Sequence, residues 1–384
     1  MSIEGVGRYG AKVDLELTED QKTVRDAFAR FFADRCPITV VRDAEPLGHA
    51  PALWARLRET GAPGMGVPEK LGGGGATAVD LVLLMVEAGK ALAPVPLAEH
   101  VAAMRTLART AAGSGAEWFA EAVEGDIVAV PALHAAVDGV ARLVPGGAVA
   151  DAVVGLDGDD LVAVRSDAPM TAPPNHACAP LADRPLRGDA VAERIVLASG
   201  GEAHALHARM RTDWQLGVAA ALTGLATRAL EIGIAYTLER RQFDRPIAAF
   251  QAVQQGLADL VAPLDGVGLL TARAAWTDDE GDADEAGRLT SMAFLAATDV
   301  ARNTTYRALH YHGGYGVTLE YDIQLHYRRA RGWPLVLGDP DEEYLALADR
   351  LFGPVGAAGA AGGGAAHAID ATGAIDAVST EEAH

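Results

Sequence analysis

The chain has 384 residues, of which half are hydrophobic, and it carries a formal net charge of -20 at pH 7. Such an acidic composition argues against binding to nucleic acid or to an anionic membrane. Cys36 and Cys178 are too few for a disulfide framework and have no metal-ligand spacing. We find no signal segment and no uninterrupted apolar run of about 18 residues. We therefore expect a cytoplasmic protein of two or three domains, with reduced thiols, no metal and no membrane span.

Residues 13–122 are expected to form an N-terminal helical domain. Thr18 is suited to cap a helix, because acidic residues follow it and Gln21 completes the spacing of a capping box. Apolar residues then recur at helical spacing. The same periodicity predicts three further helices, around Trp54, over residues 80–92 and over residues 100–112.

The character of the sequence changes over residues 123–200. Short segments rich in Val and Ile are separated there by Gly, Asp and Pro. This pattern is typical of a small antiparallel β-domain. The expected strands are residues 127–130, 152–155, 161–164 and 194–197.

Helical periodicity returns over residues 204–352, which we expect to form a C-terminal helical bundle. The acidic segment 278–285 is expected to be an exposed turn between two helices of this bundle. The tail, residues 353–384, is rich in Gly and Ala without sustained apolar periodicity, so we expect it to be disordered. The predicted fold class is α+β, with helices on both sides of the β-domain in the sequence.

A cationic corner lies inside the C-terminal region. Residues 236–251 read YTLERRQFDRPIAAFQ, after a long apolar helical run and before another helix. Arg240 and Arg241 end the first helix, where positive charge is favourable, and Pro246 prevents its continuation. A guanidinium beside an aromatic ring and a Gln suits a phosphate-bearing aromatic cofactor. Taken alone, however, these residues favour an ordinary helix end with solvated arginines.

This corner resembles the acyl-CoA dehydrogenase family, whose members read roughly YxxxRxxFGxxIxxFQ here. Asp244 replaces the usual Gly, and the matching residues are Tyr236, Arg240, Phe243, Ile247, Phe250 and Gln251. A second block, residues 312–321 and then 327–330, resembles the family's Gly-Gly-x-Gly loop and the arginine-bearing helix after it. Two blocks at the right separation are a specific signal. The resemblance implies an N-terminal helical domain, a middle β-domain and a C-terminal four-helix bundle.

The resemblance also implies FAD as cofactor, an acyl-CoA as substrate and an electron-transfer flavoprotein as electron acceptor. In the family, the arginine that matches Arg240 meets the FAD pyrophosphate, commonly on a neighbouring subunit. The residues that match Phe243 and Gln251 contact the flavin nucleotide, and the Gly loop passes near its adenosine end. The implied cofactor-binding residues are Arg240, Phe243, Gln251, His310, Gly313 and Gly314.

The catalytic base departs from the family pattern. The usual carboxylate after the arginine-bearing helix falls on Leu337, and the alternative position used by some members falls on Trp214. Neither side chain accepts a proton. Asp213 and Asp339 lie one or two residues away, but one residue along a helix rotates a side chain by about 100°. Because neither position holds an acid, the catalytic residue is unknown from the sequence. The family's Thr-x-Gln and Thr-Glu-Pro segments, which lie beside the flavin, are also missing.

Three hypotheses follow from a retained arginine corner without a base. The resemblance implies a homo- or hetero-tetramer with a related subunit. The first hypothesis is one half of a hetero-oligomer, in which the related subunit supplies the base and this chain completes the flavin site. The resemblance to actinobacterial members that degrade fatty acids or sterol side chains implies such an arrangement. The second is a self-sufficient enzyme with Asp339 or Asp213 as a relocated base. The third is a non-catalytic helical subunit used for binding or assembly.

Overall fold

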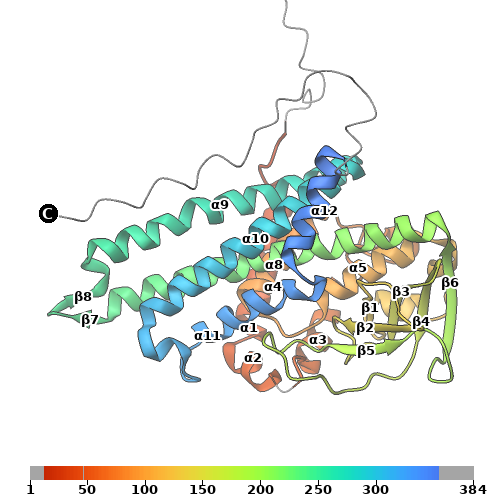
Figure 1. The fold of residues 1–384 in the computed structure, drawn as a ribbon, viewed down its shortest axis with the longest axis horizontal. Coiled ribbons are helices and arrows are strands. Elements are labelled where there is room, and N and C mark those ends of the chain that lie inside the picture. The colour runs from red at the N-terminus through yellow and green to blue at the C-terminus, as the bar shows by residue number, and fades with distance from the viewer. Residues whose placement is uncertain (1–12, 46, 354–384) are drawn as a thin grey trace, which may run out of the picture.

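The computed structural model of the protein describes residues 13–45 and 47–353, so the expected tail lies outside the described residues except for Gly353. Helical, β and helical regions follow one another along the chain. The β-region lies at one end of the long helices, and a small hairpin lies at the other (Figure 1).

The N-terminal region is helical, as expected, and its last turns lead directly into the first strand. The helix expected over residues 100–112 is divided between α5 and α6 by a turn at Arg109. The elements are α1 (Glu19–Arg35), α2 (Ile38–Ala44), α3 (Pro51–Arg58), η1 (Ala62–Gly64), η2 (Glu69–Leu71), α4 (Ala78–Lys90), α5 (Leu97–Ala108), α6 (Ala111–Ser114) and α7 (Phe119–Val123).

The middle region contains two sheets, in the orders β1-β3-β4-β6 and β2-β5. The expectation of an antiparallel domain is wrong for one pair, because β1 and β3 are parallel. The chain between them runs out to the second sheet and returns, so both strands start from the same side. The strands are β1 (Ala129–Pro131), β2 (Val140–Val144), β3 (Ala152–Asp157), β4 (Asp160–Arg165), β5 (Ala182–Pro185) and β6 (Glu193–Ser199).

The C-terminal region is a bundle of three long helices with two shorter ones packed on α10. By length and composition α8 could cross a membrane, but 61% of its most apolar window is buried inside the protein, as in the core helix of a bundle. The elements are α8 (Gly201–Glu239), β7 (Arg241–Gln242), β8 (Arg245–Pro246), η3 (Ile247–Ala249), α9 (Gln251–Asp279), α10 (Ala283–His312), η4 (Gly313–Val317), α11 (Ile323–Gly332), η5 (Pro334–Leu337) and α12 (Pro340–Phe352).

Local capping fixes where two N-terminal helices begin. The capping box predicted at Thr18 is confirmed: its hydroxyl accepts from the Gln21 amide, and the Gln21 side chain accepts from the Thr18 amide. Thr77 forms the same arrangement at the start of α4. The amides of the first turn of α4 also donate to the Asp279 carboxylate, at 2.6 and 3.1 Å. At both helix starts, side chains therefore accept hydrogen bonds from backbone amides that have no partner within the helix.

The acidic segment 278–285 is not wholly an exposed turn, because its first two residues still belong to α9. The Asp278 side chain is 9% exposed and forms ion pairs with Arg105 and Arg209. Asp279 caps α4. Within the segment, residues 279–284 are exposed, at the end of α9 and in the turn to α10, while Asp278 and Glu285 are half-buried. The charge pattern missed this because the partners come from distant helices.

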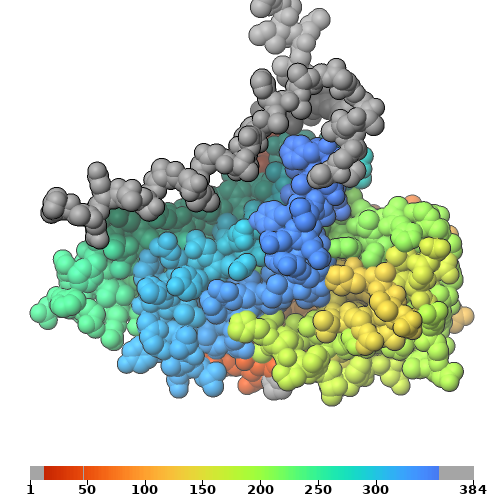
Figure 2. Space-filling view, in the orientation of Figure 1, coloured from red at the N-terminus to blue at the C-terminus, as the bar shows by residue number. Residues whose placement is uncertain are grey.

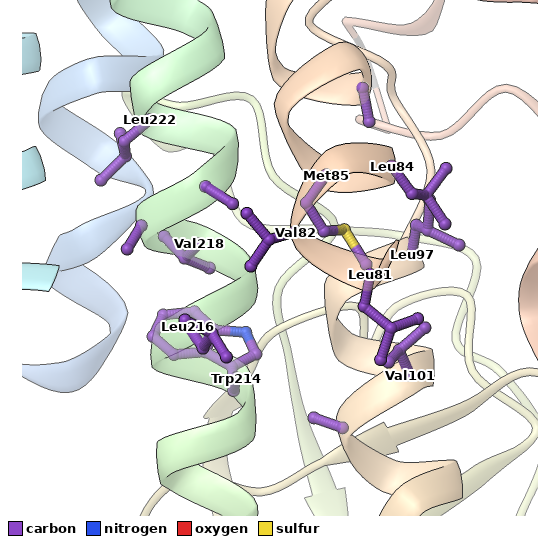
Figure 3. Close-up of a cluster of buried hydrophobic side chains, with 14 of the residues drawn as sticks. Leu81, Val82, Leu84, Met85, Leu97, Val101, Trp214, Leu216, Val218 and Leu222 are labelled. Atoms are coloured by element: carbon purple, nitrogen blue, oxygen red, sulfur yellow. The ribbon is translucent and has the colours of Figure 1, made fainter. Parts of the chain in front are cut away.

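The core that holds the regions together lies where α4 and α5 meet α8. Figure 3 shows Val82 of α4 pointing towards Val218 of α8, and Leu81 of α4 lying beside Val101 of α5. Glycines allow the two backbones to approach closely. A Cβ on Gly224 of α8 would lie 1.9 Å from the carbonyl oxygen of Val86 on α4, and one on Gly89 of α4 would meet the α8 backbone at 2.0 Å.

Gly224→Ala is expected to destabilise the protein by about 1–3 kcal/mol, because the added methyl group meets backbone atoms that have no space to move. The measurement is the midpoint of urea unfolding followed by circular dichroism. Gly266→Ala in α9 is the matched control, since nothing lies within 4 Å of its Cβ position. That variant is expected to gain about 0.5–1 kcal/mol from helix propensity. Equal effects at both sites would contradict the close helix crossing.

Candidate functional site

The arginine corner is the turn that joins α8 to α9. Arg240 leaves the helix with φ -68° and ψ 124°, and β7 pairs with β8 in a two-residue hairpin. Phe243 and Asp244 form the tip, with φ 52° and 63°. Two consecutive positive φ values match the right-handed twist of a hairpin. Asp tolerates this region better than most residues, which explains how Asp244 replaces the family's Gly.

The hairpin and the Gly loop η4 are neighbours in space. The Arg240 guanidinium lies over the Tyr315 ring, 5.8 Å from its centroid. Behind it, Tyr236 and His312 stack with ring centroids 3.9 Å apart, and Tyr321 packs edge-on against both rings. The structure therefore brings together the two sequence blocks that carry the resemblance. His312 is buried and hydrogen-bonded to the Ala308 carbonyl, which is a structural role.

The six predicted cofactor-binding residues are all exposed at this end of the bundle. Gln251 begins α9, and His310 lies in the last turns of α10, stacked on Tyr306. Nothing lies within 4 Å of a Cβ built on Gly313 or Gly314, so both glycines leave open space beside the loop. Figure 2 shows this hairpin end at the surface, away from the β-region.

The three arginines of the corner differ in their surroundings. Arg241 donates to the Asp244 carbonyl within the hairpin. The Arg245 guanidinium lies over the Phe250 ring, 4.2 Å from its centroid. None of the three has an ion-pair partner among the residues that the structure describes, and Arg240 has the loosest contact, with its guanidinium 5.8 Å from the Tyr315 centroid. Its guanidinium is therefore the least constrained of the three and is available to bind an external anion such as a phosphate.

A separate cavity, of about 110 Å³, lies where all three regions meet. Apolar side chains from α4, α5 and α8 form most of its wall. Its ionisable lining groups are Glu99, Cys178 and Arg329, of which Glu99 is the only carboxyl group in the described part of the chain to line it. Arg329 is paired with Glu45 at 3.1 Å. The cavity is therefore a mostly apolar space with one unpaired acid.

Glu99 is held by the start of α5 and by α8. One of its carboxyl oxygens accepts from the Trp214 indole nitrogen at 3.2 Å. Burial raises the pKa of Glu99, and this outweighs the opposing hydrogen bonds from its own amide and from Trp214. Its surroundings favour the neutral acid. Pro96, Leu97 and Ala98 precede it, and no motif in the sequence pointed to it.

Glu99→Gln is expected to make stability less sensitive to pH. Because the folded pKa of Glu99 is raised above its usual 4.5, the wild type loses stability as pH rises from 4.5 towards the raised value. The slope is about 1.4 kcal/mol per pH unit in that window. Melting temperatures of both proteins between pH 4 and 8 test this, with exposed Glu121→Gln as control. Parallel curves for wild type and Glu99→Gln would contradict it.

The two expected base positions hold no acid and are enclosed. Leu337 is 4% exposed and Trp214 is 1% exposed. Asp339 caps α12, where it accepts from the Asp341 amide at 3.0 Å, and does not line the cavity. Asp213 points into a cluster of three arginines. These positions argue against either aspartate as a relocated base.

Comparisons with known proteins show which family the chain resembles. Family models of the acyl-CoA dehydrogenase N-terminal and C-terminal domains match residues 18–121 and 213–351. Acyl-CoA dehydrogenase IpdE2 of Mycolicibacterium smegmatis is 30% identical over 340 residues, which are 88% of this chain and 100% of the relative.

Solved structures share the whole fold. The ChsE4-ChsE5 complex from Mycobacterium tuberculosis contains a chain that superposes with a TM-score of 0.78 at 26% identity, covering 88% of this chain and 99% of that chain. A glutaryl-CoA dehydrogenase from Mycobacterium smegmatis in complex with FADH2 gives a TM-score of 0.75 at 20% identity, covering 88% and 96%. The predicted α+β fold class is confirmed. The chain belongs to the acyl-CoA dehydrogenase family.

Proposed function

We propose that this chain is a subunit of an FAD-dependent acyl-CoA dehydrogenase and that its arginine corner completes a flavin site on a related subunit. The reaction is the α,β-dehydrogenation of an acyl-CoA thioester. FAD, when bound, accepts the hydride from the β-carbon and passes the electrons to an electron-transfer flavoprotein. The proton at the α-carbon requires a base.

The single observation that carries the proposal is the separation of the corner from the cavity. Trp214 lines the cavity, and Glu239 ends the same helix at the corner. At about 1.5 Å per residue the two positions are roughly 38 Å apart along α8. The Arg240 guanidinium is therefore far from the cavity of its own chain and cannot take part in chemistry there. At the end of the bundle it is well placed to contact the cofactor of a neighbouring subunit.

The residues of the corner suit the cofactor they would hold. Arg240 would pair with the pyrophosphate, and Phe243 and Gln251 would contact the flavin nucleotide. The open backbone at Gly313 and Gly314 leaves space for the adenosine end, with the exposed His310 nearby as a hydrogen-bonding group. An exposed guanidinium without an ion-pair partner is consistent with this assignment.

The surface around the corner also suits a subunit contact. Four apolar side chains there are more than half exposed: Leu238, Phe243, Val317 and Leu319. Such groups cluster where another chain covers them. One relative structure is itself a complex of two different chains, ChsE4 and ChsE5. We infer a hetero-oligomer in which a related subunit supplies the base.

The test is to purify the full chain alone and together with candidate partner subunits, and to measure flavin absorbance and acyl-CoA dehydrogenation. Flavin and activity are expected only in the assembled complex. Stoichiometric FAD and full activity in the lone chain would contradict the proposal. A complex that stays colourless after FAD is added would instead favour the alternative, a non-catalytic helical subunit used for assembly.

A further inference from the structure

The cavity offers an acyl group an apolar wall with one feature that packing does not explain. Met85, Leu92, Leu97 and Val218 line it, and Glu99 is set among them. An acid placed in an apolar wall costs free energy unless it is satisfied. Acids in such positions are therefore candidates for binding a ligand.

Glu99 has bonding capacity left after its contacts in the protein. The Trp214 indole donates to one carboxyl oxygen at 3.2 Å, and the amide of Glu99 itself also contributes. Beyond these, no group in the described part of the chain hydrogen-bonds to the carboxyl. Arg329, the cationic group of the cavity, is occupied by Glu45 and by the Leu325 carbonyl. Glu99 therefore faces the cavity with a free hydroxyl donor when it is protonated.

We propose that Glu99 forms a hydrogen bond with a hydroxyl or ketone oxygen on the acyl group, so that the cavity selects oxygen-bearing acyl-CoA substrates over plain hydrocarbon ones. The inference rests on the proposed function, and it assigns the class of acyl-CoA that the cavity of this chain binds in the assembled enzyme, while the related subunit supplies the base. Specificity for an oxygen follows because an apolar tail would leave the acid unsatisfied.

The cavity volume limits what enters it. At about 110 Å³ it is smaller than a typical small-molecule site of about 300–1,000 Å³. It takes a short acyl chain, or the end of a longer one, and leaves the nucleotide part of coenzyme A outside. A carboxylate on the acyl group is disfavoured, because the mostly apolar wall would leave its charge unpaired, Arg329 being occupied by Glu45. A neutral oxygen is the group that fits.

The experiment compares the binding of hexanoyl-CoA, 6-hydroxyhexanoyl-CoA and 5-oxohexanoyl-CoA to the full chain, purified with its partner subunit and flavin, by isothermal titration calorimetry. We expect at least one of the two oxygen-bearing thioesters to bind about tenfold more tightly than hexanoyl-CoA. Glu99→Leu is expected to abolish or reverse this preference. Glu99→Gln is expected to keep most of it, because an amide both donates and accepts. Exposed Glu121→Leu is the matched control and should behave as wild type.

The outcomes separate the two proposals. Binding of all three thioesters with equal affinity, or a preference that survives in folded Glu99→Leu, overturns the role of Glu99 and leaves the dehydrogenase assignment intact. Loss of turnover for every substrate in Glu99→Gln, with unchanged binding, also overturns it, because Glu99 would then act on the reacting carbons. Failure of every acyl-CoA to bind the wild-type complex contradicts the proposed function itself.

Discussion

Arg240→Ala is expected to weaken FAD binding to the assembled complex by about ten- to a hundredfold. A hydrogen bond to a charged group contributes about 1.5–3 kcal/mol, and 1.4 kcal/mol corresponds to about a tenfold change in affinity. The Arg240 side chain is exposed and lies only against the Tyr315 face, so its removal does not disturb the core. The measurement is a fluorescence titration of the flavin-free complex with FAD.

Arg241→Ala is the matched control for charge at the corner. Its guanidinium donates within the hairpin to the Asp244 carbonyl and lies one residue further from α8. Loss of general positive charge would weaken binding equally in both variants, whereas a specific contact weakens it mainly in Arg240→Ala. Wild-type affinity in a folded Arg240→Ala complex would show that the corner is an ordinary helix end.

A second arrangement of the same variant tests the contribution across subunits. Where this chain carries Arg240→Ala and the partner subunit is wild type, flavin should be lost from the sites on the partner subunit, which the corner completes. If each chain held its own flavin, the flavin would instead be lost from this chain, which carries the substitution. The roughly 38 Å of α8 between the corner and the cavity favours the first result.

The sequence predicted best those features whose residues are close in the chain. Thr18 and Gln21 form their capping box three residues apart. The corner is one continuous segment, so its residues could be identified from spacing. Even the departure at Asp244 has a local explanation, since its φ of 63° lies in the left-handed region that a Gly adopts without strain and an Asp tolerates. Such features depend on backbone geometry, which neighbouring residues largely determine.

The features that were missed join residues far apart in the chain. Glu99 and Trp214 are 115 positions apart and meet only because α5 packs on α8. Asp278 looked like part of a solvated acidic run, yet Arg105 and Arg209 enclose it. The parallel pairing of β1 and β3 depends on the path of the chain between them. Periodicity carries no information on these partners, because each depends on tertiary packing.

Asp213→Asn is expected to lower the free energy of unfolding by about 3–5 kcal/mol at pH 7, because it removes the shared partner of a buried ionic cluster. The Asp213 side chain is 2% exposed and pairs with Arg105, Arg109 and Arg209. In the variant, Arg105 and Arg209 keep Asp278, while Arg109 loses its carboxylate. Denaturant unfolding at pH 7 measures the loss, with exposed Asp26→Asn, paired only with Arg25, as control.

The pH dependence of this effect identifies its cause. Burial alone would raise the pKa of Asp213, but the attraction of three arginines outweighs it and holds the pKa below the usual 3.8. The stabilisation is therefore fully present above pH 3.8 and is lost as pH falls through the lowered value. The two proteins should converge in stability only below pH 3.8. If Asp213→Asn were as stable as wild type but at least tenfold slower in dehydrogenation, Asp213 would be acting as the base rather than holding α5 to α8.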